Sequence, residues 1–218
     1  MIRKTLILLC LVPILLISAK PINSTLISVF RVTDSPTVIS KGHYGTSLVV
    51  EISYSNDELL DWLTNVKEPY PLLLLDANWI ERSPEHIRII QERKLPTGLL
   101  GTDNEEEPDL ALVKKEIHVY KKYFQTSPLW FSTMNHQYSE ELQQSLFKQQ
   151  INLINPSIIW STSKKSIPTL QKGDLLFIPA HNQNSISFSQ LNKLLKANTF
   201  ISIEENIFGY TIKSKKFP

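Results

Sequence analysis

Short apolar runs alternate with segments of helical periodicity along most of the chain, and this alternation most constrains its fold. The clearest run, 71–76, contains four consecutive leucines, a composition typical of a strand buried on both faces of a parallel sheet. The clearest helical segment, 108–124, spaces Val113, Ile117 and Tyr120 three or four residues apart, so one stripe faces a core. The alternation predicts an α/β domain with a mostly parallel sheet, either open or closed into a barrel.

The same two patterns, with their capping residues, predict the other elements. Asn56 and Ser187 stand where helix caps are expected, and Ser83 with Pro84 marks another helix start. The expected strands are 26–30, 47–54, 71–76, 97–100, 129–132, 157–161, 174–179 and 200–203, and the expected helices are 57–65, 84–93, 108–124, 139–148 and 187–197.

Composition indicates one globular domain. The 218 residues are 42% hydrophobic, enough for one full core and hardly for two. With 23 basic and 21 acidic side chains the net charge is only +2, which argues against a nucleic-acid-binding surface. We divide the chain into a signal peptide or membrane anchor at 1–19, a stalk or N-terminal extension at 20–45, an α/β domain at 46–212 and a basic tail at 213–218.

The N-terminus has the shape of an export signal. Arg3 and Lys4 precede an apolar run at 6–17, and Ala19 offers a cleavage position. The run is shorter than the roughly 20 residues of a transmembrane helix, which favours a cleaved signal peptide. Pro21, just beyond the proposed cut, argues against cleavage, so an uncleaved anchor stays open. Either outcome predicts an extracytoplasmic protein, secreted or membrane-anchored.

Cysteine usage agrees with export, because the only cysteine, Cys10, lies within this N-terminal segment. The rest of the chain therefore holds neither a disulfide nor a cysteine metal site.

Several short sequence segments, in their order along the chain, resemble motifs of the NodB-homology polysaccharide deacetylases, in particular of their sporulation-type deacetylase-like branch. Segment 47–58 is similar to the family's first strand motif, 72–79 to a strand with a following Trp, and 82–86 to an Arg-His-Pro-Glu helix start. Segments 128–131 and 173–178 resemble the run into the third motif and the strand before a terminal histidine. The resemblance implies a distorted (β/α) barrel with mostly parallel strands and an active site at their C-terminal ends.

The resemblance also shows where catalytic residues are altered or absent. Family members activate a metal-bound water with a carboxylate base and hold the metal with one Asp and two imidazoles. Glu51 stands where the resemblance places the base, but no second carboxylate follows, and both metal-binding histidines are missing from 101–108. The arginine of the third motif is missing from 131–136. His181 lies two residues beyond the expected acid histidine, so a surface-loop histidine is its alternative interpretation.

Two further groups have a functional and a structural interpretation. The acidic residues at 103–107 suit a weak calcium site, or the positive end of the following helix. Trp79, Trp130 and Trp160 are expected near strand ends, where they would line a sugar-stacking groove or pack in the core.

We therefore expect a deacetylase-like protein, without metal-dependent catalysis and without a metal or cofactor, that binds a cell-wall or spore glycan. One alternative is an active carbohydrate N-acetyl deacetylase, or another hydrolase of non-peptide C–N bonds, with a site rebuilt around Glu51 and His181 and a divalent metal. The other is a structural envelope protein that binds a partner protein. A membrane contact is expected only through an uncleaved N-terminal segment.

Overall fold

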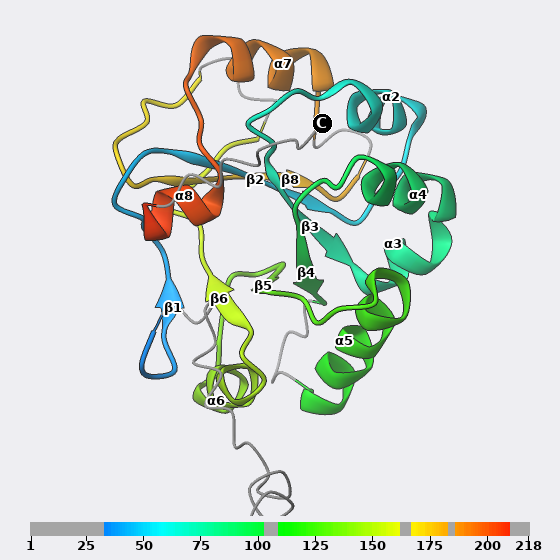
Figure 1. Cartoon of the computed structure of the whole chain (residues 1–218), viewed down its shortest axis with the longest axis vertical. Coiled ribbons are helices and arrows are strands. Elements are labelled where there is room, and N and C mark those ends of the chain that lie inside the picture. Colours follow the sequence, from blue (N-terminus) through cyan, green and yellow to red (C-terminus); the bar gives the residue numbers. More distant parts are fainter. Residues whose placement is uncertain (1–32, 103–108, 162–166, 183–185, 210–218) are drawn as a thin grey trace, which may run out of the picture.

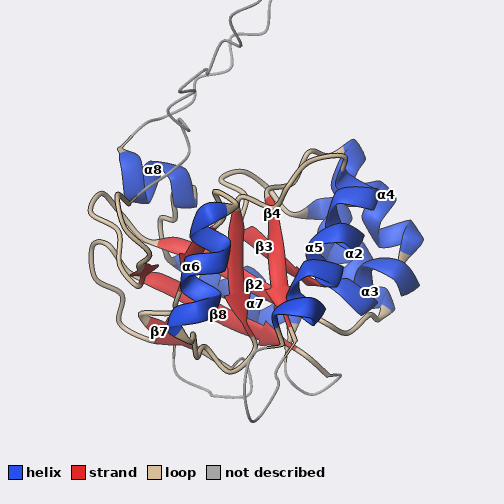
Figure 2. Ribbon diagram, turned by 90° about the horizontal axis from the view of Figure 1, so that it is seen from below, coloured by secondary structure: helices blue, strands red, loops and turns tan. Residues whose placement is uncertain are grey.

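The computed structural model describes residues 33–102, 109–161, 167–182 and 186–209. These residues build one eight-stranded sheet, in the order β1-β6-β5-β4-β3-β2-β8-β7, with parallel pairing throughout. The sheet is curled into a half-barrel (Figure 1, Figure 2), which confirms the prediction of a distorted (β/α) barrel with mostly parallel strands. The strands are β1 (Val38–Ile39), β2 (Ser47–Ile52), β3 (Leu72–Asp76), β4 (Thr97–Gly101), β5 (Trp130–Thr133), β6 (Asn152–Ile154), β7 (Ile158–Ile159) and β8 (Leu175–Ala180).

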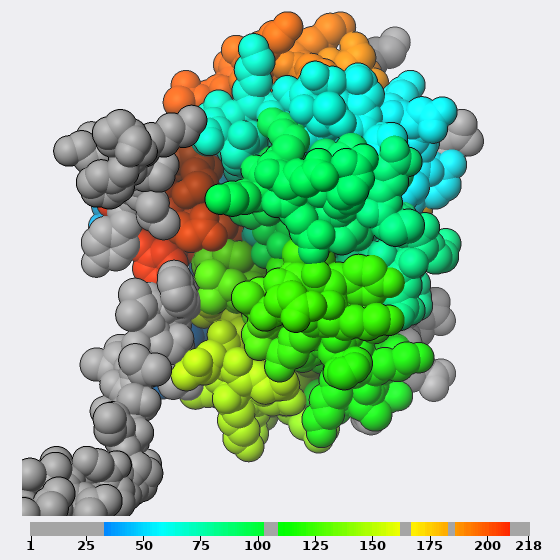
Figure 3. Space-filling view, turned by 45° about the vertical axis from the view of Figure 1, so that its right-hand side comes forward, coloured from blue at the N-terminus to red at the C-terminus, as the bar shows by residue number. Residues whose placement is uncertain are grey.

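Helices begin at the predicted caps Asn56 and Ser187, and one begins at Pro84 as predicted, although Ser83 before it makes no side-chain capping hydrogen bond. Asn56 accepts a 2.8 Å hydrogen bond from the amide of Leu59, and Ser139 and Ser187 cap two later helices. Helices α2, α4 and α5 form a continuous surface over one face of the molecule (Figure 3). The helices are α2 (Asp57–Asn65), α3 (Ala77–Arg82), α4 (Pro84–Glu92), α5 (Leu110–Phe124), α6 (Glu140–Lys148), α7 (Phe188–Ala197) and α8 (Ile203–Phe208).

Four elements, β1 among them, differ from the sequence-based expectation. The strand expected at 200–203 is wrong, because Ser202 caps the helix α8 and Gly209 ends it in the left-handed conformation, at φ 73°. The structure also adds helix α3 directly after β3 and strand β6 after α6. Both additions are shorter than the windows in which hydrophobic periodicity is readable.

Part of the expected N-terminal extension joins the domain. Val38 and Ile39 form β1 and pair with Leu153 and Ile154 of β6 at the edge of the sheet. The expected signal segment, the strand at 26–30 and the basic tail lie outside the described residues. Within the described ranges, no helix combines the length and the apolar character needed to cross a membrane.

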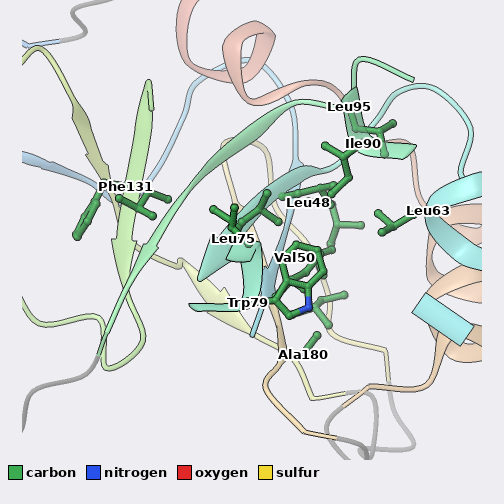
Figure 4. Packing of buried hydrophobic residues seen from close by; sticks show 14 of the residues in the cluster. Leu48, Val50, Leu63, Leu75, Trp79, Ile90, Leu95, Phe131 and Ala180 are labelled. Atoms are coloured by element: carbon green, nitrogen blue, oxygen red, sulfur yellow. The ribbon is translucent and has the colours of Figure 1, made fainter. Parts of the chain in front are cut away.

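Alternate side chains of the central strands enter two hydrophobic clusters. The larger cluster joins one sheet face to the surrounding helices and includes Val50, Leu75 and Leu63 (Figure 4). The smaller cluster lies on the other, concave face, where Val49 and Phe177 pack with residues of β5 and α8. Because strand side chains alternate, the residue two positions after Val49 also faces this concave side.

Candidate functional site

That residue is Glu51, and its carboxylate is fully buried, with 0% of the side chain exposed. It lies near the carboxyl end of β2, a central strand whose six residues are all buried. Two imidazoles approach it, one at each oxygen. Nε2 of His136 lies 2.7 Å from Oε1, and Nε2 of His181 lies 3.4 Å from Oε2.

His136 reaches Glu51 from the loop after β5. Three strand spacings separate β5 from β2 in the sheet order, about 14 Å in a flat sheet, and the curl of the half-barrel brings this loop over β2. The loop turns sharply at His136, whose φ of 57° lies in the left-handed region. The imidazole ring also packs edge-on against Phe177, with the centroids 5.7 Å apart.

His181 directly follows β8, the other neighbour of β2. Ile52 pairs with Ala180 at the end of this parallel ladder, and the amide of Ser53 still donates to the carbonyl of Ala180 at 3.3 Å. Ser53 and His181 therefore leave the sheet side by side. Their side chains meet, with Ser53 Oγ 3.1 Å from Nδ1 of His181.

The imidazoles favour the charged form of the carboxylate. Burial alone raises the pKa of Glu51, but the hydrogen-bonding and electrostatic effects of His136 and His181 outweigh burial, so the pKa lies below its ordinary value. Oε1 has a hydrogen bond from His136, whereas Oε2 has no hydrogen-bond partner. The 3.4 Å separation from His181 is therefore an ion-pair distance rather than a hydrogen bond.

Tyr138 stabilises the same concave face behind His136. Its hydroxyl donates to the carbonyl of Ile154 at 2.7 Å and lies 2.9 Å from Ser132 Oγ. Burial raises the pKa of Tyr138 to about 12, so the phenol stays protonated and serves as a fixed hydrogen-bond donor.

Two other buried carboxyls are engaged elsewhere. Asp76 caps helix α3 through the amide of Trp79 at 2.7 Å, and Glu116 accepts hydrogen bonds from Thr102. Burial raises the pKa of both carboxyls, which makes them poor anionic partners.

The metal site of a metal-dependent deacetylase does not fit the described residues. No three His, Cys, Asp or Glu side chains within them are grouped so that they could hold a metal ion. A metal ligand must point a lone pair at the metal. The Glu51 oxygen nearest His136 already accepts the imidazole N–H, so a proton lies between these two side chains where a shared metal would have to lie. The acidic segment at 103–107, which suits either a weak calcium site or the positive end of the following helix, lies outside the described residues.

Three tryptophans are expected either in a sugar-binding groove or in the core, and the structure places all three in the core. Trp79, Trp130 and Trp160 are 1%, 1% and 3% exposed. Trp79 packs beneath β3 within the larger cluster (Figure 4), and its Nε1 donates to Ser55 Oγ at 2.6 Å. Large aromatic rings at strand ends pack well in a core, so sequence position alone does not distinguish the two roles.

Glu51 and His181 do converge at the strand ends, but sequence reasoning missed His136. The sequence around it shows only a short polar turn after an expected strand, and that pattern carries no signal of an inward-pointing imidazole. A left-handed, non-glycine turn residue is visible only in the structure.

Comparison with solved structures identifies the architecture. The family 4 carbohydrate esterase pseudoenzyme BA3943 from Bacillus anthracis superposes with a TM-score of 0.62 at 15% identity, over 79% of this chain and 69% of that chain. The chain has the fold of the family 4 carbohydrate esterases. This NodB-type fold is the one that the motif order implied.

Two deacetylases also share this carbohydrate-esterase fold. The peptidoglycan N-acetylglucosamine deacetylase Bc1960 matches with a TM-score of 0.57 at 16% identity, over 77% of this chain and 91% of that one. The chitin deacetylase of the fungus Colletotrichum lindemuthianum matches with a TM-score of 0.60 at 12% identity, over 81% and 93%. No protein-family model matches the sequence, and no curated protein matches it significantly.

Proposed function

We propose that this protein is an extracytoplasmic, deacetylase-like protein that binds a cell-envelope glycan and does not carry out metal-dependent deacetylation. The glycan class is taken from the proteins that share its fold, which include deacetylases of peptidoglycan and chitin. The export-signal pattern at 1–19 supports the extracytoplasmic location.

The state of Glu51 carries this proposal. In metal-dependent deacetylation a carboxylate base at the strand ends must reach a metal-bound water. Here the carboxylate is 0% exposed, and Oε1 accepts a hydrogen bond from His136. A base in this position has no open side from which to take a proton from water, and no metal cluster exists among the described side chains beside it.

An exposed aromatic ring near the strand ends would favour glycan binding, and Tyr54 supplies one. It directly follows Ser53 at the end of β2 and is 37% exposed. Tyrosine combines an apolar face for a sugar ring with a polar edge, a combination suited to wet carbohydrate surfaces.

Isothermal titration calorimetry on the purified full chain, with chitin oligosaccharides and soluble peptidoglycan fragments, tests the proposal. We expect binding that Tyr54→Ala weakens about tenfold, the change that about 1.4 kcal/mol produces. Tyr44→Ala, which removes a ring 57% exposed at another place, is the matched control and should bind normally.

Acetate release from the same glycans should be undetectable with added zinc, cobalt or manganese. Metal-stimulated release that a chelator abolishes would establish the active-deacetylase alternative instead. Failure of the folded protein to bind any of the glycans would leave the partner-binding alternative, which cross-linking in envelope extracts then addresses.

A further inference from the structure

Ser53, His181 and Glu51 form a continuous polar line from the protein surface to its interior. Ser53 Oγ lies 3.1 Å from Nδ1 of His181, and Nε2 of the same ring lies 3.4 Å from Oε2 of Glu51. Ser53 and His181 are both half-buried, with the imidazole 28% exposed, whereas the Glu51 carboxylate is 0% exposed. We propose that Ser53 is the nucleophile of a metal-independent acyl-transfer site, with His181 as its base and Glu51 as the group that orients the base.

The arrangement follows from strand geometry rather than from chance proximity. Glu51 and Ser53 are two residues apart, so both face the concave side of the sheet. His181 is the next residue after the pair Ile52–Ala180 on the neighbouring parallel strand. Glu51 lies on β2, whereas Ser53 and His181 are the first residues beyond β2 and β8, where the amide of Ser53 still donates to the carbonyl of Ala180. This last backbone hydrogen bond limits the freedom of Ser53 and His181 to move apart.

The geometry matches the logic of nucleophile, base and orienting carboxylate. For the Ser53 hydroxyl to donate to Nδ1, His181 must carry its proton on Nε2, which faces the Glu51 carboxylate. A negative charge beside Nε2–H favours this tautomer and stabilises the imidazolium that forms when Nδ1 takes the serine proton. The 3.4 Å gap is within the range over which such contacts tighten when a substrate binds.

The second histidine keeps the carboxylate ionised and in place. His136 donates to Oε1 of Glu51 at 2.7 Å and so fixes the orientation of the carboxylate. The other oxygen, Oε2, has no hydrogen bond and faces His181. Because His136 contacts the carboxylate rather than the hydrogen-bonded pair of Ser53 and His181, its role is positioning.

The substrate class is an ester, because an alcohol leaving group requires less activation than the amine of an amide. Ser53 Oγ attacks the ester carbonyl carbon, its proton passes to His181 Nδ1, and the bond to the leaving alkoxide breaks as that proton is returned to it. Water, deprotonated by the same nitrogen, then cleaves the acyl-serine to a carboxylic acid and restores Ser53. The reaction is a hydrolysis and needs neither a metal nor an oxidant.

Two measurements on the full chain test the proposal. The first is covalent labelling by a fluorophosphonate, with the modified peptide identified by mass spectrometry. The second is hydrolysis of p-nitrophenyl acetate in the presence of a chelator. We expect labelling at Ser53 and a hydrolysis rate that falls about 100-fold or more in Ser53→Ala and His181→Gln, the usual scale for loss of a positioned catalytic group.

Ser189→Ala, which removes an exposed serine on α7, should keep both signals. Thermal unfolding and circular dichroism show whether each variant is folded. If Ser53→Ala perturbs the strand end, Ser53→Cys replaces it, because cysteine has nearly the size of serine and keeps a nucleophile. Labelling of another residue, full hydrolysis by folded Ser53→Ala, or the absence of any labelling of the folded wild type would overturn the proposal. Glycan binding measured by calorimetry does not require Ser53 to react. Ser53→Ala should therefore lose ester hydrolysis but keep glycan binding, which separates a failure of the acyl-transfer proposal from a failure of the glycan-binding proposal.

Discussion

The carboxylate of Glu51 and the imidazole of His136, separated by 85 residues of sequence, are joined by a 2.7 Å hydrogen bond inside the half-barrel. A fully buried carboxylate is costly unless it is paired, and here two histidines supply the pairing. Through this contact the stability of the fold depends on the ionisation and pairing of Glu51, so unfolding experiments can measure both.

Acid should remove the contribution of Glu51 to stability. Its pKa in the folded protein lies below the ordinary 4.5, so the carboxylate stabilises the fold above about pH 4.5, and this contribution is lost as the pH falls through the folded-state pKa. In urea unfolding between pH 5 and pH 3, the difference in free energy of unfolding between wild type and Glu51→Gln should therefore narrow toward acid.

Glu116→Gln is the control for this experiment, with the opposite sign. Burial raises the pKa of Glu116, so its ionisation destabilises the fold as the pH rises above 4.5. Relative to wild type, Glu116→Gln should gain stability with rising pH. A difference for Glu51→Gln that stays constant across the acid range would contradict the pairing.

His136→Asn should destabilise the protein by about 1.5–3 kcal/mol at neutral pH, the range for a hydrogen bond to a charged group. Asparagine tolerates the left-handed φ of 57°, so the change removes the imidazole without adding much backbone strain. In a double-mutant cycle with Glu51→Gln, the combined loss should be smaller than the sum of the two single losses. Additive losses would show that the two side chains do not interact.

Trp130→Phe should lower stability without changing glycan affinity. The indole is 1% exposed, and its Nε1 donates to Glu204 at 2.9 Å, a bond between β5 and α8 worth about 1.5–3 kcal/mol. Calorimetry on the folded variant, compared with Tyr54→Ala, separates a core residue from a binding residue. Weaker binding by Trp130→Phe with unchanged unfolding would restore a sugar-contacting role for Trp130.

Asn206→Ala should cost about 3 kcal/mol or more, because one buried side chain serves several backbone groups. Its Oδ1 accepts from the amides of Tyr44 and Gly45 at 3.3 and 3.1 Å, and its Nδ2 donates to the carbonyls of Gly173 and Asp174 at 3.5 and 3.3 Å. The amide thereby joins the segment that leads into β2 to the segment that leads into β8.

Asn198→Ala is the matched control in urea unfolding. Its side chain is half-buried and donates to a single carbonyl, that of Leu194, at 3.1 Å, so its loss should cost about 1 kcal/mol. Equal losses for the two variants would show that Asn206 does not hold the segments before β2 and β8 together.

The helices show how far local sequence signals reach. The stripe of Leu59 and Leu63 with the cap Asn56 predicts the bounds of α2, because capping and periodicity act within a few residues. The type of an element cannot be predicted in this way when the element is shorter than the window in which periodicity is readable. Ile201 and Ile203 suit a strand in the sequence, but Ser202 caps a helix there.

The α/β class and the parallel core strands follow from the amino-acid sequence, because strand and helix periodicity are nearly local properties. The meeting of Glu51 with His181 depends on the pairing of β2 with β8, two strands far apart in the sequence. The burial of the three tryptophans and the part played by His136 depend instead on how the whole chain packs. The loop after β5 reaches Glu51 across three strand spacings of a curled sheet, and curvature is a collective property of all its strands and the helices packed on them.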